Sequence, residues 1–421
     1  MRIEQRLLDE IDRFQPAAIE MLQNLVRIPS ITGDEKKAQT FVQNSFADLG
    51  LTVDAWCPTH KELSSHSAFS DDGLPLGERA VVVGRLKGSD SSARSLILNG
   101  HVDVVPPGEE SAWENGPWSA SIRDGKLFGR GSCDMKGGLV SGIAALAAIK
   151  KSGMNLRGDV LIQSVIGEET GGVGTLATIQ RGYRADAAIV LEPTRMALCP
   201  VGAGAASFRL HVSGRSAHGA MRMEGVSAIE KFYLLLDAIH ELEHARHSKF
   251  RHPLFSNGEL ISPISVGKVM AGDWPSTVPE KLIAEGRFGV LPGEDIAGAR
   301  SDFESAIRKA GEKDAWLKEH PPQVEWFEGQ FESAETPAES PILRELAQSH
   351  QQMLGAKPPM HGVPYGSDLR FFTNNAKMPA VLYGPGDVRV AHSANEFVPL
   401  NEVMAVSKIV GLTILRWCGL E

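Results

Sequence analysis

Hydrophobic and polar positions follow two different patterns along the chain. Up to about residue 204, amphipathic stretches alternate with short apolar runs. Helical spacing predicts a pair of N-terminal helices broken at Pro16 and further helices near 34–49, 136–151 and 172–181. Apolar runs of strand length lie near 80–86, 95–100, 159–166 and 186–191. This alternation predicts an α/β fold with a mostly parallel central sheet covered by helices.

The pattern changes between residues 205 and 330. The alternating strand "SFRLHVSG" precedes a long helix near 226–247, strands near 262–270 and 281–290, a helix near 295–310 and the strand "QVEWFE". This βαββαβ order is ferredoxin-like and predicts a small sheet with helices on one face. Residues 338–421 return to helix, loop, strand and helix. We therefore expect residues 205–330 to be an inserted domain within one discontinuous domain of residues 1–204 and 331–421, with the polar segment 59–79 as a surface loop.

Composition narrows the class of protein. The chain has 421 residues, 42% hydrophobic and 23% charged, which is typical of a globular protein long enough for two domains. A net charge of -9 without a lysine or arginine cluster argues against nucleic acid and acidic membrane surfaces as partners. The N-terminus lacks the apolar core of a signal peptide, and the four cysteines show no CxxC spacing. A cytoplasmic protein with reduced thiols is expected.

The first candidate for chemistry is "LILNGHVDVVPPG", residues 96–108. His101 and Asp103 follow an apolar strand, at the end where open α/β sheets place their ligand sites. Two residues apart on extended chain, they face the same way. This spacing suits a metal-binding imidazole with a carboxylate beside it, and it equally suits a buried His–Asp pair without a metal.

Four further strand ends or loops carry groups of the same kind. Asp134 lies in "GRGSCDMKGG", Glu168 and Glu169 follow "VLIQSVI", Glu192 ends the strand of "AAIVLEPT", and His392 lies in "GPGDVRVAHSANE". Each alone could be a helix cap, a solvated charge or a loop hydrogen-bonding group. Together, at five separate junctions, they favour a metal centre. Nitrogen and oxygen ligands without sulfur suit zinc, cobalt or manganese, and a carboxylate can bridge two such ions.

These segments, with "WENGPWSASIRDGKLFGRGSCDMKGG", "GEETGGVGT" and "GRSAHGA", resemble the acetylornithine deacetylase and succinyl-diaminopimelate desuccinylase family, relatives of the dizinc aminoacylases and glutamate carboxypeptidases. The resemblance runs in order from about residue 20 to the end of the chain. It implies a zinc-peptidase-like catalytic domain, an inserted domain that forms a homodimer, and a site for two divalent metal ions. Zinc is the ion that it favours, with cobalt or manganese as alternatives.

The resemblance also implies a role for each candidate residue. Asp134 would bridge the two ions. His101 and Glu192 would complete the first ion's ligands, and Glu169 and His392 those of the second. Asp103 would orient His101, and Glu168 would be the general base, because it can take a proton from water without being a metal ligand itself.

The inserted domain holds further candidates. The resemblance implies that His218 donates to the developing oxyanion, often from a partner subunit, although from the residues alone it could simply complete a turn before a helix. Ser276 and Gly289 stand where relatives often carry an asparagine and an arginine that hold a substrate carboxylate. Arg287, on the same strand as Gly289, and Arg370, in "YGSDLRFF", are the candidate substrate-binding residues, and either could instead form a surface ion pair.

The predicted function is metal-dependent hydrolysis of the amide bond of a small N-acyl amino acid or related amide. A dipeptidase or carboxypeptidase on the same scaffold is the alternative among enzymes. A catalytically silent metal-containing binding protein is the alternative from another class, and the complete set of ligands and base argues against it. The glycine-rich "GGVGT" and "GAGAAS" lack the strand, loop and lysine context of a phosphate-binding loop.

Overall fold

A computed structural model describes residues 2–256 and 260–421, which form two compact units. Unit 1 contains the chain up to Pro200, together with Glu335–His361 and Asp368–Glu421. Unit 2 contains Val201–Ala334 and Gly362–Ser367. The contacts therefore divide the chain at Val201 and Ala334 instead of at 205 and 330. They also assign the short segment Gly362–Ser367 to unit 2, which the sequence pattern does not indicate.

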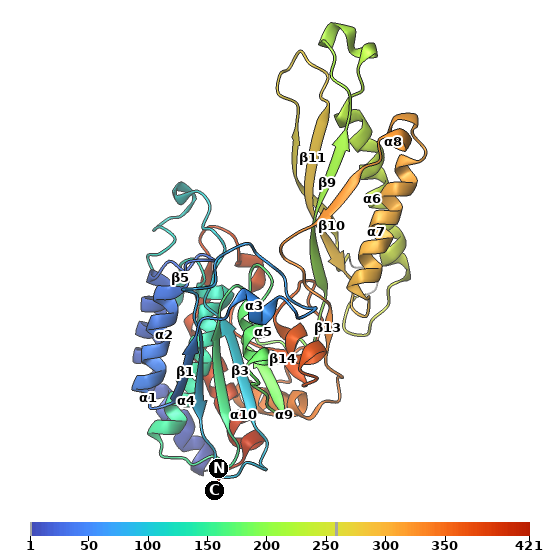
Figure 1. Ribbon diagram of the computed structural model, residues 1–421. Coiled ribbons are helices and arrows are strands. Elements are labelled where there is room, and N and C mark those ends of the chain that lie inside the picture. Colours follow the sequence, from blue (N-terminus) through green and yellow to red (C-terminus); the bar gives the residue numbers. More distant parts are fainter. Residues whose placement is uncertain (1, 257–259) are drawn as a thin grey trace. The chain divides into compact units, whose positions relative to one another are not determined.

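A six-stranded sheet forms the centre of unit 1 (Figure 1). Its strands are β1 (Thr52–Trp56), β2 (Val81–Leu86), β3 (Leu96–His101), β6 (Val160–Val165), β7 (Ala187–Val190) and β14 (Ala380–Leu382), in the order β1-β2-β6-β3-β7-β14. β2 is antiparallel to both of its neighbours, and the remaining neighbours are parallel. The mostly parallel sheet is as predicted, whereas the edge strand β1 is an addition.

Helices cover both faces of this sheet. They are α1 (Arg2–Arg27), α2 (Lys36–Asp48), α3 (His60–Leu63), α4 (Gly137–Lys151), α5 (Val173–Gln180), α9 (Pro341–Leu354) and α10 (Leu400–Cys418), with short helical turns η1 (Glu110–Ala112), η2 (Ser132–Lys136), η4 (Phe371–Asn375) and η5 (Val388–Val390). An added Cβ at Gly142 of α4 would lie 3.3 Å from a side-chain atom of Leu98 and 3.4 Å from one of Ile162, so α4 packs closely on β3 and β6. From the opposite face, Asn99 donates to Thr175 of α5 at 2.9 Å. α1 and α10 pack on α4, which is therefore buried between helices and sheet.

The predicted break at Pro16 is wrong, because α1 continues through it. Pro16 lies on the exposed side of the helix, where the carbonyl that loses its partner can bond to water. The opposite side buries an apolar stripe that holds the helix on the core, formed by Leu7, Ile11, Phe14, Ala18, Leu22 and Leu25. Tertiary packing thus outweighs the local helix-breaking tendency.

Segment 59–79 is only in part the surface loop that was expected. It contains α3 and ends at Arg79, which is buried and forms an ion pair with buried Glu35. Arg79 also pairs with Asp72 at 3.0 Å, and Asp72 accepts a hydrogen bond from Thr170, next to Glu169. The segment is therefore fastened to the turn that follows β6.

Two shorter parts complete unit 1. β4 (Ser121–Arg123), β5 (Lys126–Phe128) and β15 (Phe397–Pro399) form a three-stranded antiparallel sheet that the sequence pattern does not indicate. The stretch Ser132–Lys151 spans η2 and α4. Its length and composition would allow it to cross a membrane, yet its most apolar 18 residues are all buried inside the protein. It is a core helix.

Unit 2 has the predicted βαββαβ order. It contains β8 (Val201–Gly202), β9 (Gly204–Ser213), η3 (Gly219–Glu224), α6 (Ala228–Lys249), β10 (Ile264–Ala271), β11 (Lys281–Val290), α7 (Ile296–Gly311), α8 (Ala315–Glu319) and β12 (Gln323–Trp326), and the short strand β13 (Ala334–Glu335) follows. The antiparallel sheet has the order β10-β11-β9-β12. Its core joins sheet and helices through Phe208, Phe288 and Phe303.

Candidate metal centre and active site

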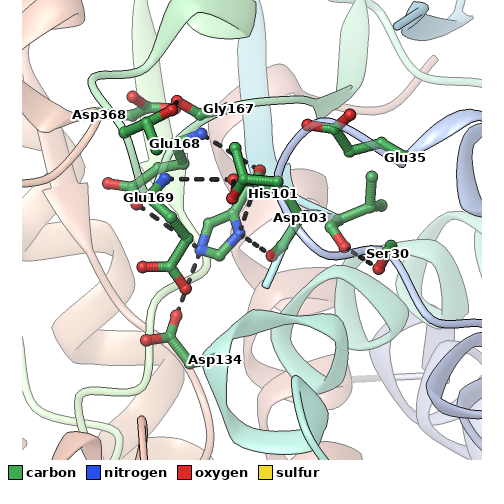
Figure 2. Close-up of polar contacts among 12 residues, drawn as sticks. Ser30, Glu35, His101, Asp103, Asp134, Gly167, Glu168, Glu169 and Asp368 are labelled. Carbon is green, nitrogen blue, oxygen red and sulfur yellow. Dashed lines mark hydrogen bonds and ion pairs between the residues drawn. The ribbon is translucent and has the colours of Figure 1, made fainter. Parts of the chain in front are cut away.

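His101 lies at the carboxyl end of β3, and the backbone fixes the orientation of its ring. Its Nδ1 is 2.8 Å from the carbonyl oxygen of Asp103, so Nδ1 is the nitrogen that donates a proton there. The other nitrogen, Nε2, faces carboxylates: it is 3.2 Å from Asp134 and 4.0 Å from Glu168 (Figure 2), and it is 3.9 Å from Glu192. A buried imidazole held in this tautomer offers Nε2 as a ligand.

Asp134, in the turn η2, faces two imidazoles with its two oxygens. Oδ1 is 3.2 Å from Nε2 of His101, and Oδ2 is 3.5 Å from Nε2 of His392. Nε2 of His392 is also 3.2 Å from Glu169. The structure thus places the two predicted histidines at the two oxygens of one carboxylate, which a ligand that bridged two ions would require.

The candidate ligand atoms form two overlapping groups. His101 lies with Asp134 and Glu169 in one, and with Glu168 and Glu192 in the other, and within each group the potential ligand atoms are all within 4.8 Å of one another. Burial raises the pKa of Glu168, Glu169 and Glu192, and the charges of neighbouring carboxylates raise it further. A buried set of carboxylates that repel one another when ionised, with imidazoles beside them, fits divalent cations, which would relieve that repulsion.

The pKa values of the imidazoles respond to the same cluster. Burial opposes the charged form of His101, yet its hydrogen bond to Asp134 and the nearby carboxylates raise its pKa well above the usual value. Hydrogen bonds to Asp134 and Glu169 raise the pKa of His392 to about 10. Burial likewise opposes the charged form of Asp134, but hydrogen bonds from both imidazoles hold its pKa well below the usual range.

Asp103 supports the site differently from the way the motif suggests. Its backbone carbonyl, not its side chain, makes the short contact with His101, since the carboxylate lies 3.6 Å from Nδ1. The carboxylate instead accepts hydrogen bonds from the backbone N–H groups of Glu168 and Glu169, each at 3.2 Å (Figure 2), and from Thr32 at 3.0 Å. Asp103 therefore links the end of β3 to the turn that carries both glutamates.

That turn after β6 depends on glycine. Gly167, Gly171 and Gly172 all have positive φ, and an added Cβ at Gly172 would lie 2.3 Å from a side-chain oxygen of Asp368. Arg370 is buried, and its guanidinium donates to the carbonyl of Gly171 at 2.7 Å. Arg370 therefore bonds to the turn and has almost no exposed surface, which argues against the predicted contact with substrate.

Two other predicted residues lie in unit 2. Nδ1 of His218 accepts a hydrogen bond from the backbone of Ala220 at 3.1 Å and so caps η3, which is the structural alternative that its sequence position allows. Arg287 donates to the carbonyl of Pro364 at 3.2 Å. The catalytic role of His218 and the substrate contact of Arg287 stay predictions.

Asp368 is a buried residue that sequence reasoning missed. It accepts a hydrogen bond from Thr175 at 2.5 Å, and its charge acts on both Glu168 and Glu192. Burial raises its pKa to about 6. Asp368 lies beside Glu168 in Figure 2. The sequence "GSD" holds no local signal for this placement, because its partners lie about 190 residues away.

The chain belongs to peptidase family M20/M25/M40, whose model matches residues 97–416. Members of this family are metal-dependent hydrolases of amide bonds, and the resemblance to the deacetylases and desuccinylases is confirmed. The match covers most of unit 1 and all of unit 2.

Curated relatives extend the likeness over nearly the whole chain. N-formyl-4-amino-5-aminomethyl-2-methylpyrimidine deformylase of Bacillus subtilis is 29% identical over 90% of this chain and 89% of its own. Succinyl-diaminopimelate desuccinylase of Gluconacetobacter diazotrophicus is 27% identical over 96% and 97%. Acetylornithine deacetylase of Proteus mirabilis is 25% identical over 96% and 98%.

Among solved structures, the di-peptidase Dug1p of Saccharomyces cerevisiae superimposes with a TM-score of 0.75 at 16% identity, covering 99% of this chain and 98% of its own. This likeness supports the fold.

The metal-free protein should lose stability as the pH rises. The pKa of His101 in the folded chain is above the ordinary value of 6.5, and that of His392 is about 10, so the stability that their protonated forms contribute is full below about pH 6.5 and is lost toward pH 10. Ionisation of Glu168 and Glu192, whose pKa values are raised by burial, acts in the same direction. Urea midpoints measured in chelator across this range should fall, and H392Q should reduce the slope. A flat profile in the wild type would contradict this electrostatic description.

Proposed function

We propose that this protein removes the acyl group from a small N-acyl amino acid or related amide by hydrolysis, at a site for two divalent metal ions. The observation that carries the proposal is the position of Asp134, whose two oxygens face the imidazoles of His101 and His392. A carboxylate can bridge two ions about 3.5–4 Å apart, as in the two-metal sites of hydrolases.

The residues present fit such a pair of ions. His101, Glu192 and Asp134 would hold the first, and Glu169, His392 and Asp134 the second. The set has nitrogen and oxygen donors only, which favours zinc, with cobalt and manganese as alternatives. When bound, the ions supply Lewis acidity, which lowers the pKa of a water molecule and polarises the amide carbonyl.

Glu168 is the proposed general base. Its side chain is buried, and its nearest oxygen lies 4.0 Å from Nε2 of His101. Burial raises its pKa, which makes it a better proton acceptor than an exposed carboxylate. Glu168 takes a proton from the attacking water as the water oxygen bonds to the amide carbon. The C–N bond then breaks, and Glu168 returns the proton to the departing amine.

The names of the relatives support deacylation. The deformylase, the desuccinylase and the deacetylase each match about nine tenths of this chain or more. The fold is also that of a di-peptidase, so cleavage of dipeptides is the alternative activity. Arg287 is the better candidate of the two arginines for a substrate carboxylate, because Arg370 is buried against Gly171.

Replacing Glu168 by glutamine should separate chemistry from metal binding. E168Q should retain its metal content while kcat falls by about 10²–10⁴, because only the proton acceptor is removed. Elemental analysis should be paired with a panel of N-formyl, N-acetyl and N-succinyl amino acids and free dipeptides. E192Q is the matched control and should lose metal. Loss of metal in E168Q would contradict the base assignment, and cleavage of dipeptides alone would favour the alternative activity.

We also infer that unit 2 forms a homodimer, in which His218 of the partner subunit would donate to the oxyanion. β10 is an outer strand of its sheet, and such edges can pair with another chain. Large apolar side chains are exposed along β10, in the following turn and on α6: Val269, Met270, Trp274, Tyr233 and Leu234. The compartment that we propose is the cytoplasm, since all four cysteines are free.

Charges on this edge should break the dimer. The double variant V269K/W274K should halve the mass measured by light scattering and lower amide hydrolysis, because lysines block edge pairing and the second subunit's histidine is lost. L354K, at an exposed apolar position of unit 1, should change neither quantity. An unchanged mass in the double variant would contradict the proposed interface.

A further inference from the structure

Glu396 is a buried carboxylate that the proposed hydrolysis does not use. It lies four residues after His392 and directly before β15, and its side chain has 0% exposure. Burying a carboxylate is unfavourable unless hydrogen bonds and an opposite charge compensate for the lost water. The partners of Glu396 therefore indicate what its burial achieves.

All four hydrogen bonds that we describe for Glu396 join it to the segment that carries Asp134. Its Oε1 accepts from the backbone N–H groups of Cys133 at 2.9 Å and Asp134 at 3.1 Å. Its Oε2 accepts from the guanidinium of Arg130 at 2.5 Å. Its backbone carbonyl accepts from the N–H of Gly129 at 2.9 Å. Glu396 thus forms hydrogen bonds to four residues of the segment from Gly129 to Asp134.

These bonds act where regular structure is missing. The backbone of Asp134 has φ -115° and ψ 98°, which is not helical, so no helical hydrogen-bond ladder sets the direction of its side chain. Two successive N–H groups bonded to one carboxylate oxygen fix the plane of this turn instead. With the backbone fixed, the two oxygens of Asp134 are directed at His101 and His392.

The His392 loop has an unusual backbone conformation at the histidine itself. His392 has φ +59°, a conformation uncommon for a residue with a side chain, and its side chain is 53% exposed. Beyond it, Asn395 bonds to the backbone of Ala112 and Glu114. Glu396 then fastens the loop to the Asp134 segment, in addition to the contact of Cys133 with the carbonyl of Asp387, and so links two elements whose side chains face each other at 3.5 Å.

The charge of Glu396 is balanced within the same segment. Arg130 is also buried, and its guanidinium lies over the ring of Trp113 as well as on Glu396. A buried ion pair often adds little to stability compared with well-packed apolar side chains. Fold stability alone is therefore a weak reason for placing two charges here, whereas control of the turn's geometry is a sufficient one.

We propose that Glu396 is a positioning residue: it holds the Asp134 turn and the His392 loop at the separation that the second metal ion requires. This inference rests on the metal centre of the proposed function. It concerns most directly the ion that Asp134, Glu169 and His392 would hold, because Glu396 joins the segments that carry Asp134 and His392.

The test is zinc binding to the full-length, chelator-treated chain carrying E396Q, measured by titration calorimetry. Glutamine has the same shape but only one acceptor oxygen, so it cannot satisfy both the turn's N–H groups and Arg130. Loss of an outer-shell partner commonly weakens metal binding by about 10–100-fold. We expect at least one of the two zinc ions to bind at least about tenfold more weakly than in the wild-type chain.

E243Q is the matched control. Glu243 is a buried carboxylate of unit 2 that accepts a hydrogen bond from the backbone of Ile264 and lies outside the metal centre. E243Q should lower the melting temperature without changing either zinc affinity. E396D, which keeps the charge but shortens the side chain, provides a second variant if E396Q does not fold, and it too should weaken zinc binding.

The outcomes are distinct. Zinc binding weakened by about tenfold or more in E396Q or E396D supports the positioning role. Wild-type affinity at both sites with a lower melting temperature, as in E243Q, would overturn it and leave Glu396 a purely structural residue. If the wild-type chain itself binds no zinc, the proposed metal centre fails, and the positioning role fails with it.

Discussion

Electrostatic repulsion within a buried cluster is the constraint on which the rest of this structure depends. Four carboxylates, Asp134, Glu168, Glu169 and Glu192, surround Nε2 of the buried His101, with His392 closing the other side. Parallel strands bring their carboxyl ends to one edge of the sheet, which is why residues far apart in sequence meet there. Burial then raises the pKa of the glutamates, so the cluster is best satisfied when positive ions replace the missing water.

The side chains of this cluster come from turns, and turns need anchors to be precise in position. Asp103 accepts hydrogen bonds from the backbone N–H groups of Glu168 and Glu169. Arg370 donates a hydrogen bond to the carbonyl of Gly171 in the same turn. Glu396 accepts hydrogen bonds from the backbone N–H groups of the Asp134 turn. Each anchor is buried and polar, and each joins segments distant in sequence. These three buried polar groups therefore fix the turns around the site, and the apolar core behind the site supplies a rigid base.

The sequence allowed the sheet, the inserted βαββαβ unit and the metal-ligand candidates to be predicted, because periodicity and the position of polar residues at strand ends are local signals. It did not reveal that α1 continues through Pro16, because the packing of the helix on the core, which outweighs the effect of the proline, is a long-range interaction. The anchoring of segment 59–79 through Arg79 and Glu35 was also hidden, since it depends on a contact between residues 44 apart. Asp103, Arg370 and Glu396 show the same limit: the residue type suggests chemistry, while the bonds that define its role are long-range.

The most direct test of the account is anomalous diffraction at the zinc edge from crystals of the zinc-loaded protein. The account predicts two peaks on either side of Asp134, one beside His101 and Glu192 and the other beside Glu169 and His392, with Glu168 bound to neither. A single peak, peaks that do not share Asp134, or a peak coordinated by Glu168 would contradict it.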